Sequence, residues 1–326
     1  MMRTIRRFGV AVVMIWMVTT LTFFLIRLMP GNPIATAYQT LLQQGMTAQQ
    51  AAVQIHILYD VYPNQPVLTQ YFVYLWNLVH GNLGTSIVYT GRPVLGLILA
   101  AAPWTLLLVS MGLLISFVIG LLLGVIVAIH RDTWIDNLTS QVASVFHGVP
   151  NYITGFIFLY FFTVMWPWFP FGNIYNPSIA VGLTFPFVAS VAYHAVLPVA
   201  AYVFGAFGGW TLSTKSAAMA VLGDDFMMAD KIRGLTSAQR LDHLVNNSIL
   251  PLFTGFVLSL GFMFGGSVFI ESMFSIPGLG YLVQSATTQR DYPVMQATFM
   301  LLSAAVILAN FAADTLYSRI DPRIRN

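Results

Sequence analysis

The sequence has no cysteine and very few charged residues. Without cysteine the chain can form neither a disulfide bond nor a thiolate metal site. Charged residues make up 8% of the 326 residues, compared with about 25% in soluble domains, whereas hydrophobic residues make up 57%. The net charge of +3 comes from basic residues that are not gathered on one face, so the sequence does not indicate nucleic-acid binding. This composition predicts an integral membrane protein.

The sequence also lacks the motifs of ATP-binding and hydrolytic enzymes. Its two lysines are Lys215 and Lys231, and neither lies in a phosphate-binding G-x-x-x-x-G-K-[ST] run. The histidines form no H-E-x-x-H motif, and there is no G-x-S-x-G nucleophile elbow. We therefore expect no catalytic residue, no metal site and no cofactor in this chain.

Six apolar stretches are long enough to cross a bilayer, whose core requires about 20 apolar residues in a helix. They cover residues 8–26, 103–129, 138–166, 193–214, 249–270 and 294–316. Residues 177–192 are also apolar, and they predict either a short interfacial helix or an extension of the fourth stretch. Pro198 predicts a kink in that fourth stretch. The expected fold is an all-α integral membrane protein with about six transmembrane helices.

The apolar stretches divide the chain into four predicted parts. These are an N-terminal tail with the first transmembrane helix (1–29), an external helical subdomain (30–102), a transmembrane core (103–316) with a cytoplasmic hairpin (215–248), and a cytoplasmic tail (317–326). Of the 14 lysine and arginine residues, only Arg27, Arg92 and Arg290 fall on the side opposite the N-terminus. The positive-inside rule therefore places both termini in the cytoplasm of a multi-pass protein of the cell membrane.

The external subdomain predicts two helices. Thr47 is a suitable N-cap for the first helix, and the second is expected at about 67–79, after two prolines. The subdomain is either a solvated cap or a docking surface for a partner. On the same side, Trp166 and Trp168 belong to an aromatic cluster that forms either an interfacial belt or a surface for stacking on a sugar.

The most charged segment lies between the fourth and fifth apolar stretches. Eight of the 25 charged side chains (14 basic and 11 acidic) fall between Lys215 and Asp242. Asp224 or Asp225 can cap the first turn of a helix there, because a carboxylate accepts hydrogen bonds from the exposed amides. A membrane protein that gathers its charges in one loop presents that loop to water.

Helix signals within this segment predict a helical hairpin. Gly234 predicts a left-handed end to the first helix. Thr236 and Gln239 form a capping box that starts a second helix, and Pro251 is expected to begin the fifth span. The first helix has an apolar stripe formed by Met228, Ile232 and Leu235. The alternative interpretation is an amphipathic hairpin that lies on the lipid headgroups.

Residues 225–234, followed after a spacer by residues 250–251, resemble the coupling loop of ABC importer permeases. The branch they resemble imports dipeptides, oligopeptides, nickel and some oligosaccharides. Further segments similar to this branch occur in the family's order at 27–33, 70–75, 80–86, 271–280, 290–293 and 321–325. The loop departs from the family at two positions, since a small residue usually stands at Asp230 and a second basic residue at Met228.

This resemblance implies the fold of a type I ABC importer permease and a set of partners. The partners are a second homologous permease subunit, two ABC ATPase subunits that bind ATP and magnesium, an extracytoplasmic solute-binding protein and the membrane lipid. The implied ATPase-coupling residues are Asp225, Met228, Ala229, Asp230, Arg233, Gly234 and Leu235. The implied external-loop residues are Glu271, Pro277, Gly278, Gly280 and Arg290.

Residues 271–280 are expected to form a short external structure instead of continuing the fifth span, because proline and glycines interrupt it. Glu271 is the only glutamate, and we expect it to pair with Arg290 or Arg92. Candidate pore-lining residues lie on 138–166 and 249–270.

The expected function is passage of oligopeptides or oligosaccharides through an ATP-driven importer, and the solute is expected to carry little net charge. The alternative is an ion-coupled secondary transporter of a small polar solute. Such a transporter would need ionisable groups deep in the membrane, and the only acidic residue within a predicted span, Asp314, lies near the cytoplasmic end of that span.

Overall fold

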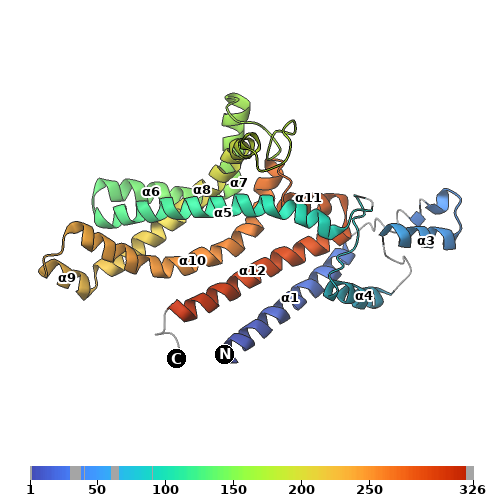
Figure 1. The fold of residues 1–326 in the computed structure, drawn as a ribbon, viewed down its shortest axis with the longest axis horizontal. Helices are drawn as coiled ribbons and strands as arrows, with labels where there is room; N and C mark the ends of the chain where they lie inside the picture. Colours follow the sequence, from blue (N-terminus) through green and yellow to red (C-terminus); the bar gives the residue numbers. More distant parts are fainter. Residues whose placement is uncertain (1, 30–37, 40, 60–65, 90, 321–326) are drawn as a thin grey trace. The chain divides into compact units, whose positions relative to one another are not determined.

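The computed structural model describes residues 2–29, 38–39, 41–59, 66–89 and 91–320 (Figure 1). Helices dominate this part of the chain, in which β pairing is limited to an isolated bridge between Thr85 and Pro93. The helices are α1 (Met2–Leu28), α3 (Ala48–Tyr59), α4 (Val67–Val79), α5 (Val94–Ile129), α6 (Trp134–Gly148), α7 (Asn151–Leu159), the π-helix η1 (Tyr160–Met165), α8 (Phe185–Leu222), α9 (Asp225–Ile232), α10 (Ser237–Met273), α11 (Leu279–Gln289) and α12 (Tyr292–Ile320). The family-like segment 321–325 and residues 30–33 lie outside the described residues.

Four of these helices are long and apolar enough to cross a membrane, namely Ile5–Leu28, Val94–Ile129, Phe185–Leu222 and Tyr292–Ala312. Two bent helix pairs raise the number of candidate spans to six, if each pair is counted as one span. The prediction of an all-α membrane protein with about six spans is therefore confirmed. The chain divides into two compact units, Met1–Thr105 with Pro277–Leu308 and Leu106–Ile276 with Ala309–Asn326.

The third predicted span is not one straight helix. Helices α6 and α7 with η1 are bent by 94° where residues 149–150 separate them. Val149 has an extended backbone, and Pro150 is the N-cap of α7. Because proline has no N–H and disfavours a helical residue before it, Pro150 ends the first helix and starts the second in a new direction.

Of the apolar residues 177–192, those from Phe185 onward lengthen the fourth span, whereas residues 177–184 form no helix. Helix α8 begins at Phe185, with Thr184 as its N-cap, and it continues through Pro198 as one helix. The irregular segment before α8 contains Trp166 and Trp168, whose rings stack on each other with centroids 5.5 Å apart.

Both predicted external helices are present. Gln50 N donates to the Thr47 hydroxyl at 3.3 Å and Thr47 N donates to Gln50 Oε1 at 3.0 Å, so α3 starts with a capping box. The second helix, α4, has the predicted bounds of 67–79.

Helix α5 packs against α8 through small residues spaced four apart. Gly112, Gly120 and Gly124 lie on this stripe, and Ser116 between them is fully buried. A Cβ atom on Gly112 would lie 2.5 Å from Tyr202 Cβ, and one on Gly124 would lie 2.5 Å from Thr214 Cβ. The backbones of α5 and α8 therefore approach more closely than side chains would allow, as in small-x-x-x-small packing of membrane helices.

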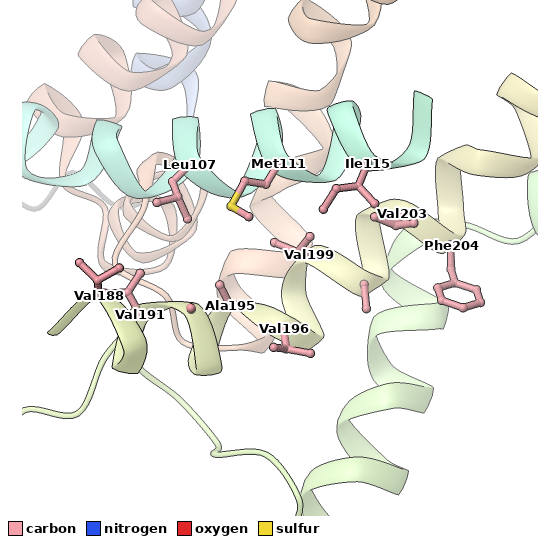
Figure 2. Close-up of a pocket in the computed structure, with 12 residues that line it drawn as sticks. Leu107, Met111, Ile115, Val188, Val191, Ala195, Val196, Val199, Val203 and Phe204 are labelled. Carbon is pink, nitrogen blue, oxygen red and sulfur yellow. The ribbon is translucent and has the colours of Figure 1, made fainter. Parts of the chain in front are cut away.

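The same helix pair also borders an apolar hollow (Figure 2). Its volume is about 560 Å³, and Leu107, Met111 and Ile115 of α5 face Val188, Val191 and Val203 of α8 across it. Every lining side chain is apolar. The hollow therefore offers no side-chain group that could recognise the backbone or charged ends of a peptide.

Gly120→Ala tests the close approach of α5 and α8. The added methyl group would meet Trp210 Cβ and the backbone of Thr211. We expect the overpacking to cost about 1–3 kcal/mol of stability, which a lower unfolding temperature in detergent would report.

Gly96→Ala is the matched control on the same helix, because a Cβ there has no heavy atom within 4 Å. It should be neutral, or stabilising by up to about 1 kcal/mol, since alanine favours helix more than glycine does. Equal unfolding temperatures for the two variants would contradict the packing described for Gly120.

Candidate functional site

The charged segment forms the predicted hairpin at the end of α8 (Figure 1). Helix α9 has Asp224 as its N-cap, although the Asp224 side chain makes no capping hydrogen bond. Gly234 has φ +77°, which confirms the left-handed stop. Gln239 N donates to the Thr236 hydroxyl and Thr236 N donates to Gln239 Oε1, which confirms the capping box of α10.

The second helix of the hairpin does not end before the fifth span. Helix α10 runs from Ser237 to Met273 and includes Pro251. The helix is bent at Pro251, where the fifth span was predicted to begin, although no helix boundary falls there. The neighbouring segments Ser237–Ile249 and Pro251–Gly261 are bent by 44°. A displacement of the hairpin can therefore pass directly into a membrane-spanning segment.

The apolar stripe of α9 faces away from the rest of its unit. Met228 is 69% exposed and Ile232 is 79% exposed. Asp225, Arg233 and Gly234 are also exposed, whereas Ala229 and Leu235 are half-buried. Most of the predicted coupling residues are thus accessible, whereas Asp230 is only 5% exposed.

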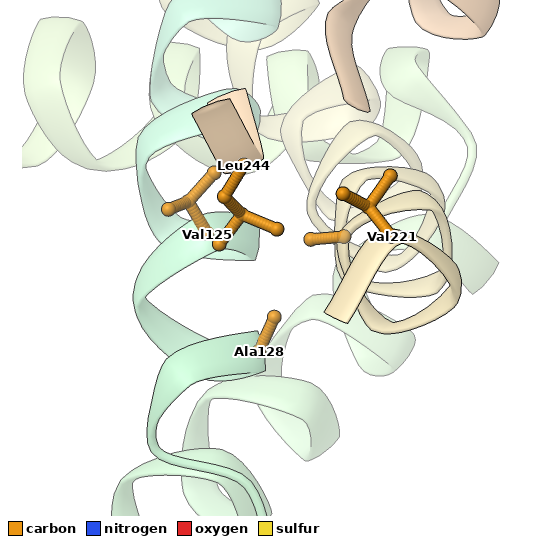
Figure 3. Close-up of a cluster of buried hydrophobic side chains, with 5 residues drawn as sticks. Val125, Ala128, Val221 and Leu244 are labelled. Atoms are coloured by element: carbon orange, nitrogen blue, oxygen red, sulfur yellow. The ribbon is translucent and has the colours of Figure 1, made fainter. Parts of the chain in front are cut away.

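A hydrophobic cluster joins the hairpin to the spans behind it (Figure 3). Val125 and Ala128 of α5 meet Val221 of α8 and Leu244 of α10, and Met227 of α9 packs against them. Each helix of the hairpin contributes a side chain to this cluster. The hairpin is therefore packed onto the ends of α5 and α8 and does not hang as a free loop.

The buried Asp230 links the two helices of the hairpin. Its Oδ2 lies 2.6 Å from His243 Nδ1 on α10, and the Leu235 backbone N–H donates to the Asp230 carbonyl oxygen at 3.1 Å. This explains the departure from the family pattern, since the carboxylate at this position has a partner within the hairpin. The Asp230 carboxylate therefore lies between the two helices of the hairpin, turned toward His243.

Lys215 also has a partner within the chain. Its Nζ forms an ion pair with Asp136 of α6 and lies 3.0 Å from Ser140 Oγ. The Asp136 carboxylate also accepts the Asp132 N–H at 3.1 Å. Lys215 therefore fastens α8 to α6, and the water-facing charges of the segment begin at Asp224.

A double-mutant cycle tests the contact between Asp230 and His243. Asp230→Ala should lower stability by about 1 kcal/mol through loss of a charge-assisted hydrogen bond whose partner is partly exposed. His243→Ala should cost a similar amount, and the double variant should cost no more than either single variant. Chemical unfolding of the purified protein measures all four forms.

The outcome that would contradict this contact is strict additivity of the two substitutions. Arg240→Ala is the control on the same helix, because its guanidinium donates to Ser237 Oγ at 3.3 Å within α10. Its effect should add to that of Asp230→Ala.

The predicted external-loop residues occupy the junction between α10 and α11. Helix α10 ends at Met273, Ser275 has φ +51°, and Ile276 N donates to Glu271 O at 2.8 Å. Helix α11 then begins at Leu279, with Gly278 as its N-cap. The predicted break is confirmed at 274–278, but Glu271 lies in the last turn of α10 and Gly280 lies within α11, so residues 271–273 do continue the fifth span.

Glu271 is fully buried, which the sequence did not indicate. Its pairing with Arg290 or Arg92 stays a prediction. Pro277 separates the two helices, and the Leu279 N–H donates to Thr105 Oγ1 at 2.7 Å. This hydrogen bond fastens the start of α11 to α5.

Arg290 and Asp291 form a second junction. Arg290 is the left-handed C-cap of α11, with φ +58°. Asp291 is 1% exposed, and its carboxylate accepts hydrogen bonds from the Ser86 hydroxyl, Ile87 N at 3.1 Å and Val88 N at 3.2 Å. Two of the family-like segments, 80–86 and 290–293, therefore lie together. The sequence analysis singled out Arg290, whereas the buried hydrogen bonds to residues 86–88 are made by Asp291.

Asp291→Ala should release the loop at residues 86–88. The change leaves two backbone N–H groups and one hydroxyl without their acceptor, and an unsatisfied buried polar group costs about 1–3 kcal/mol. We expect a lower unfolding temperature and faster proteolysis within residues 80–93. Asp291→Asn keeps one acceptor oxygen and should have a smaller effect.

The exposed Asp242→Ala is the control for loss of a carboxylate. If Asp291→Ala were no more sensitive to heat and protease than Asp242→Ala, the hydrogen bonds of Asp291 would not hold the loop.

The sequence of the chain matches those of known transport proteins. The family model "Binding-protein-dependent transport system inner membrane component" matches residues 120–326. The chain is 31% identical over 321 residues to the oligopeptide transport system permease protein AppB of Bacillus subtilis (strain 168), covering 98% of both chains. It is 32% identical over 338 residues to the di/tripeptide transport system permease protein DppB of Pseudomonas aeruginosa (strain UCBPP-PA14), again covering 98% of both chains.

The fold and the hairpin thus define a multi-pass permease component of a transport system. The chain belongs to the binding-protein-dependent transport system inner membrane component family, and it is an ABC transport permease. Family membership favours this class over the ion-coupled secondary transporter. The secondary-transporter alternative depended on Asp314, and the structure does not describe the side chain of this residue.

Proposed function

We propose that the chain is one of two homologous permease subunits of an ATP-driven peptide importer. The observation that carries this proposal is the hairpin, which exposes Met228 and Ile232 to a partner while its core side chains pack onto α5 and α8. An ATPase subunit that held the exposed face would move α10 directly, because α10 continues from the hairpin into the membrane.

The work is divided among several subunits in this proposal. Two ATPase subunits bind ATP and magnesium, and each grips one permease hairpin. Their closure on ATP brings the hairpins together and opens the pore outward, and hydrolysis returns the pore to its inward-open state. The charge asymmetry of the sequence supports cytoplasmic termini, which places the hairpin on the side where ATP is available.

The proposed solute is a peptide, because the names of the relatives AppB and DppB specify oligopeptide and di/tripeptide transport. Delivery by an extracytoplasmic solute-binding protein fits the family name. The aromatic cluster at Trp166 and Trp168 is weaker support for a sugar as the solute, because the two rings stack on each other. Oligosaccharide uptake is therefore an alternative outcome of the transport test below.

Gly234→Ala tests coupling through the hairpin. Gly234 has φ +77°, and a Cβ atom added to it would meet no heavy atom within 4 Å. The only penalty is therefore the backbone strain of a left-handed alanine, about 1 kcal/mol. We expect reduced peptide-stimulated ATP hydrolysis and reduced peptide uptake by the reconstituted importer, with normal membrane insertion.

Gly223→Ala is the matched control, because Gly223 has φ −83°, which alanine adopts without strain. Unchanged coupling in Gly234→Ala would refute the proposed role of the hairpin. Uptake of oligosaccharides without uptake of peptides would refute the proposed solute and leave the coupling mechanism intact.

A further inference from the structure

Helix α4 has an exposed apolar face that the proposed function does not use. Its exposed side chains follow helical spacing at Leu68, Phe72, Trp76 and Val79, and these are 64%, 66%, 68% and 82% exposed. Positions i, i+4, i+8 and i+11 share one side of a helix. A continuous stripe of large apolar side chains therefore runs along the whole helix.

The opposite face of α4 packs on the Leu28 end of α1 (Figure 1). Tyr71 OH lies 2.7 Å from Thr20 Oγ1, and the Tyr71 and Tyr74 rings lie 5.2 and 5.3 Å from the ring of Phe23. Burial raises the pKa of the Tyr74 hydroxyl to about 12. The side of α4 that carries Tyr71 and Tyr74 is thus covered by α1, and the stripe lies on the uncovered side of α4.

The contacts with α1 fix the depth of α4 relative to the membrane. Arg27 Nε donates to Gln70 Oε1 at 3.2 Å, and Arg27 is in the last turn of a helix that spans the membrane as Ile5–Leu28. On α1, Leu25 and Leu28 are 52% and 78% exposed, as expected for side chains in contact with lipid. Helix α4 therefore lies at the depth where a bilayer core gives way to headgroups.

The composition of α4 suits this depth. Its 13 residues include no charged side chain, and at about 1.5 Å per residue it is too short to cross the bilayer. Trp76 lies near its C-terminal end, with its ring 4.3 Å from the His80 ring. Tryptophan is enriched at the membrane interface because it combines an apolar ring with a polar N–H.

We propose that α4 is an interfacial helix whose stripe of Leu68, Phe72, Trp76 and Val79 is immersed in the lipid leaflet at the Leu28 end of α1. Exposed apolar side chains of α1 and the stripe of α4 lie at the same end of α1, so the bilayer is the occupant that the position of α4 selects. The membrane then holds the external segment at a fixed height, and α3, whose exposed side chains include Gln49 and Gln50, remains in water.

Site-directed spin labelling tests this proposal. Because the chain has no cysteine, single substitutions Leu68→Cys, Phe72→Cys and Val79→Cys give unique labels. The full chain is co-expressed with its partner subunits and reconstituted in vesicles of phosphatidylethanolamine and phosphatidylglycerol. Leu25→Cys serves as the lipid reference and Gln50→Cys as the water reference.

We expect the labels on the stripe to resemble Leu25→Cys, with high accessibility to oxygen and several-fold lower accessibility to a water-soluble nickel complex than Gln50→Cys. Resemblance to Gln50→Cys would overturn the proposal. Low accessibility to both reagents would also overturn it and assign the stripe to a protein partner, and repeating the measurement without the receptor would identify which partner.

A label-free measurement covers the case in which a substituted variant fails to insert. Brominated phosphatidylcholine in the vesicles should quench the fluorescence contributed by Trp76, obtained as the difference between the unmodified chain and Trp76→Phe. Absence of quenching for this residue would refute immersion.

Discussion

The close contact between α5 and α8 is the constraint on which the second unit depends. Lipid gives membrane helices little hydrophobic reason to associate, so their contacts rely on tight packing. Glycine at positions 112, 120 and 124 permits that packing, because a Cβ there would collide with α8. Once these helices are in contact, their shared end provides the surface on which the hairpin is anchored, and the apolar hollow lies along the same helix pair.

Three of the four carboxylates that are buried among the described residues join separate segments of the chain. Asp136 joins α6 to α8 through Lys215, and Asp291 holds the loop at residues 86–88. Asp230 joins the two helices of the hairpin through His243. A charged group that leaves water needs a partner, so these residues mark places where the fold is specified in detail. Each of these three carboxylates has a partner within the chain, so none is available to bind a coupling ion.

Local signals predicted the hairpin well because its boundaries are set by short-range chemistry. The capping boxes at Thr47 and Thr236 and the left-handed Gly234 involve residues at most three positions apart. The break at Pro277 and the bounds of α4 follow from proline in the same way. Signals of this kind were less decisive at Pro251 and at residues 177–192, where proline and apolar composition fit a continuous helix as well as a helix start.

The sequence by itself determined that this protein is helical, lies in a membrane and presents one charged hairpin to water, because composition and local spacing carry that information. Only the tertiary structure decided that the carboxylate of Asp230 faces His243, that Asp291 gathers three donors from a loop about 200 residues away, and that one face of α4 is left uncovered. Such pairings depend on which segments meet in space, and neither hydropathy nor helical periodicity encodes the partner of a side chain.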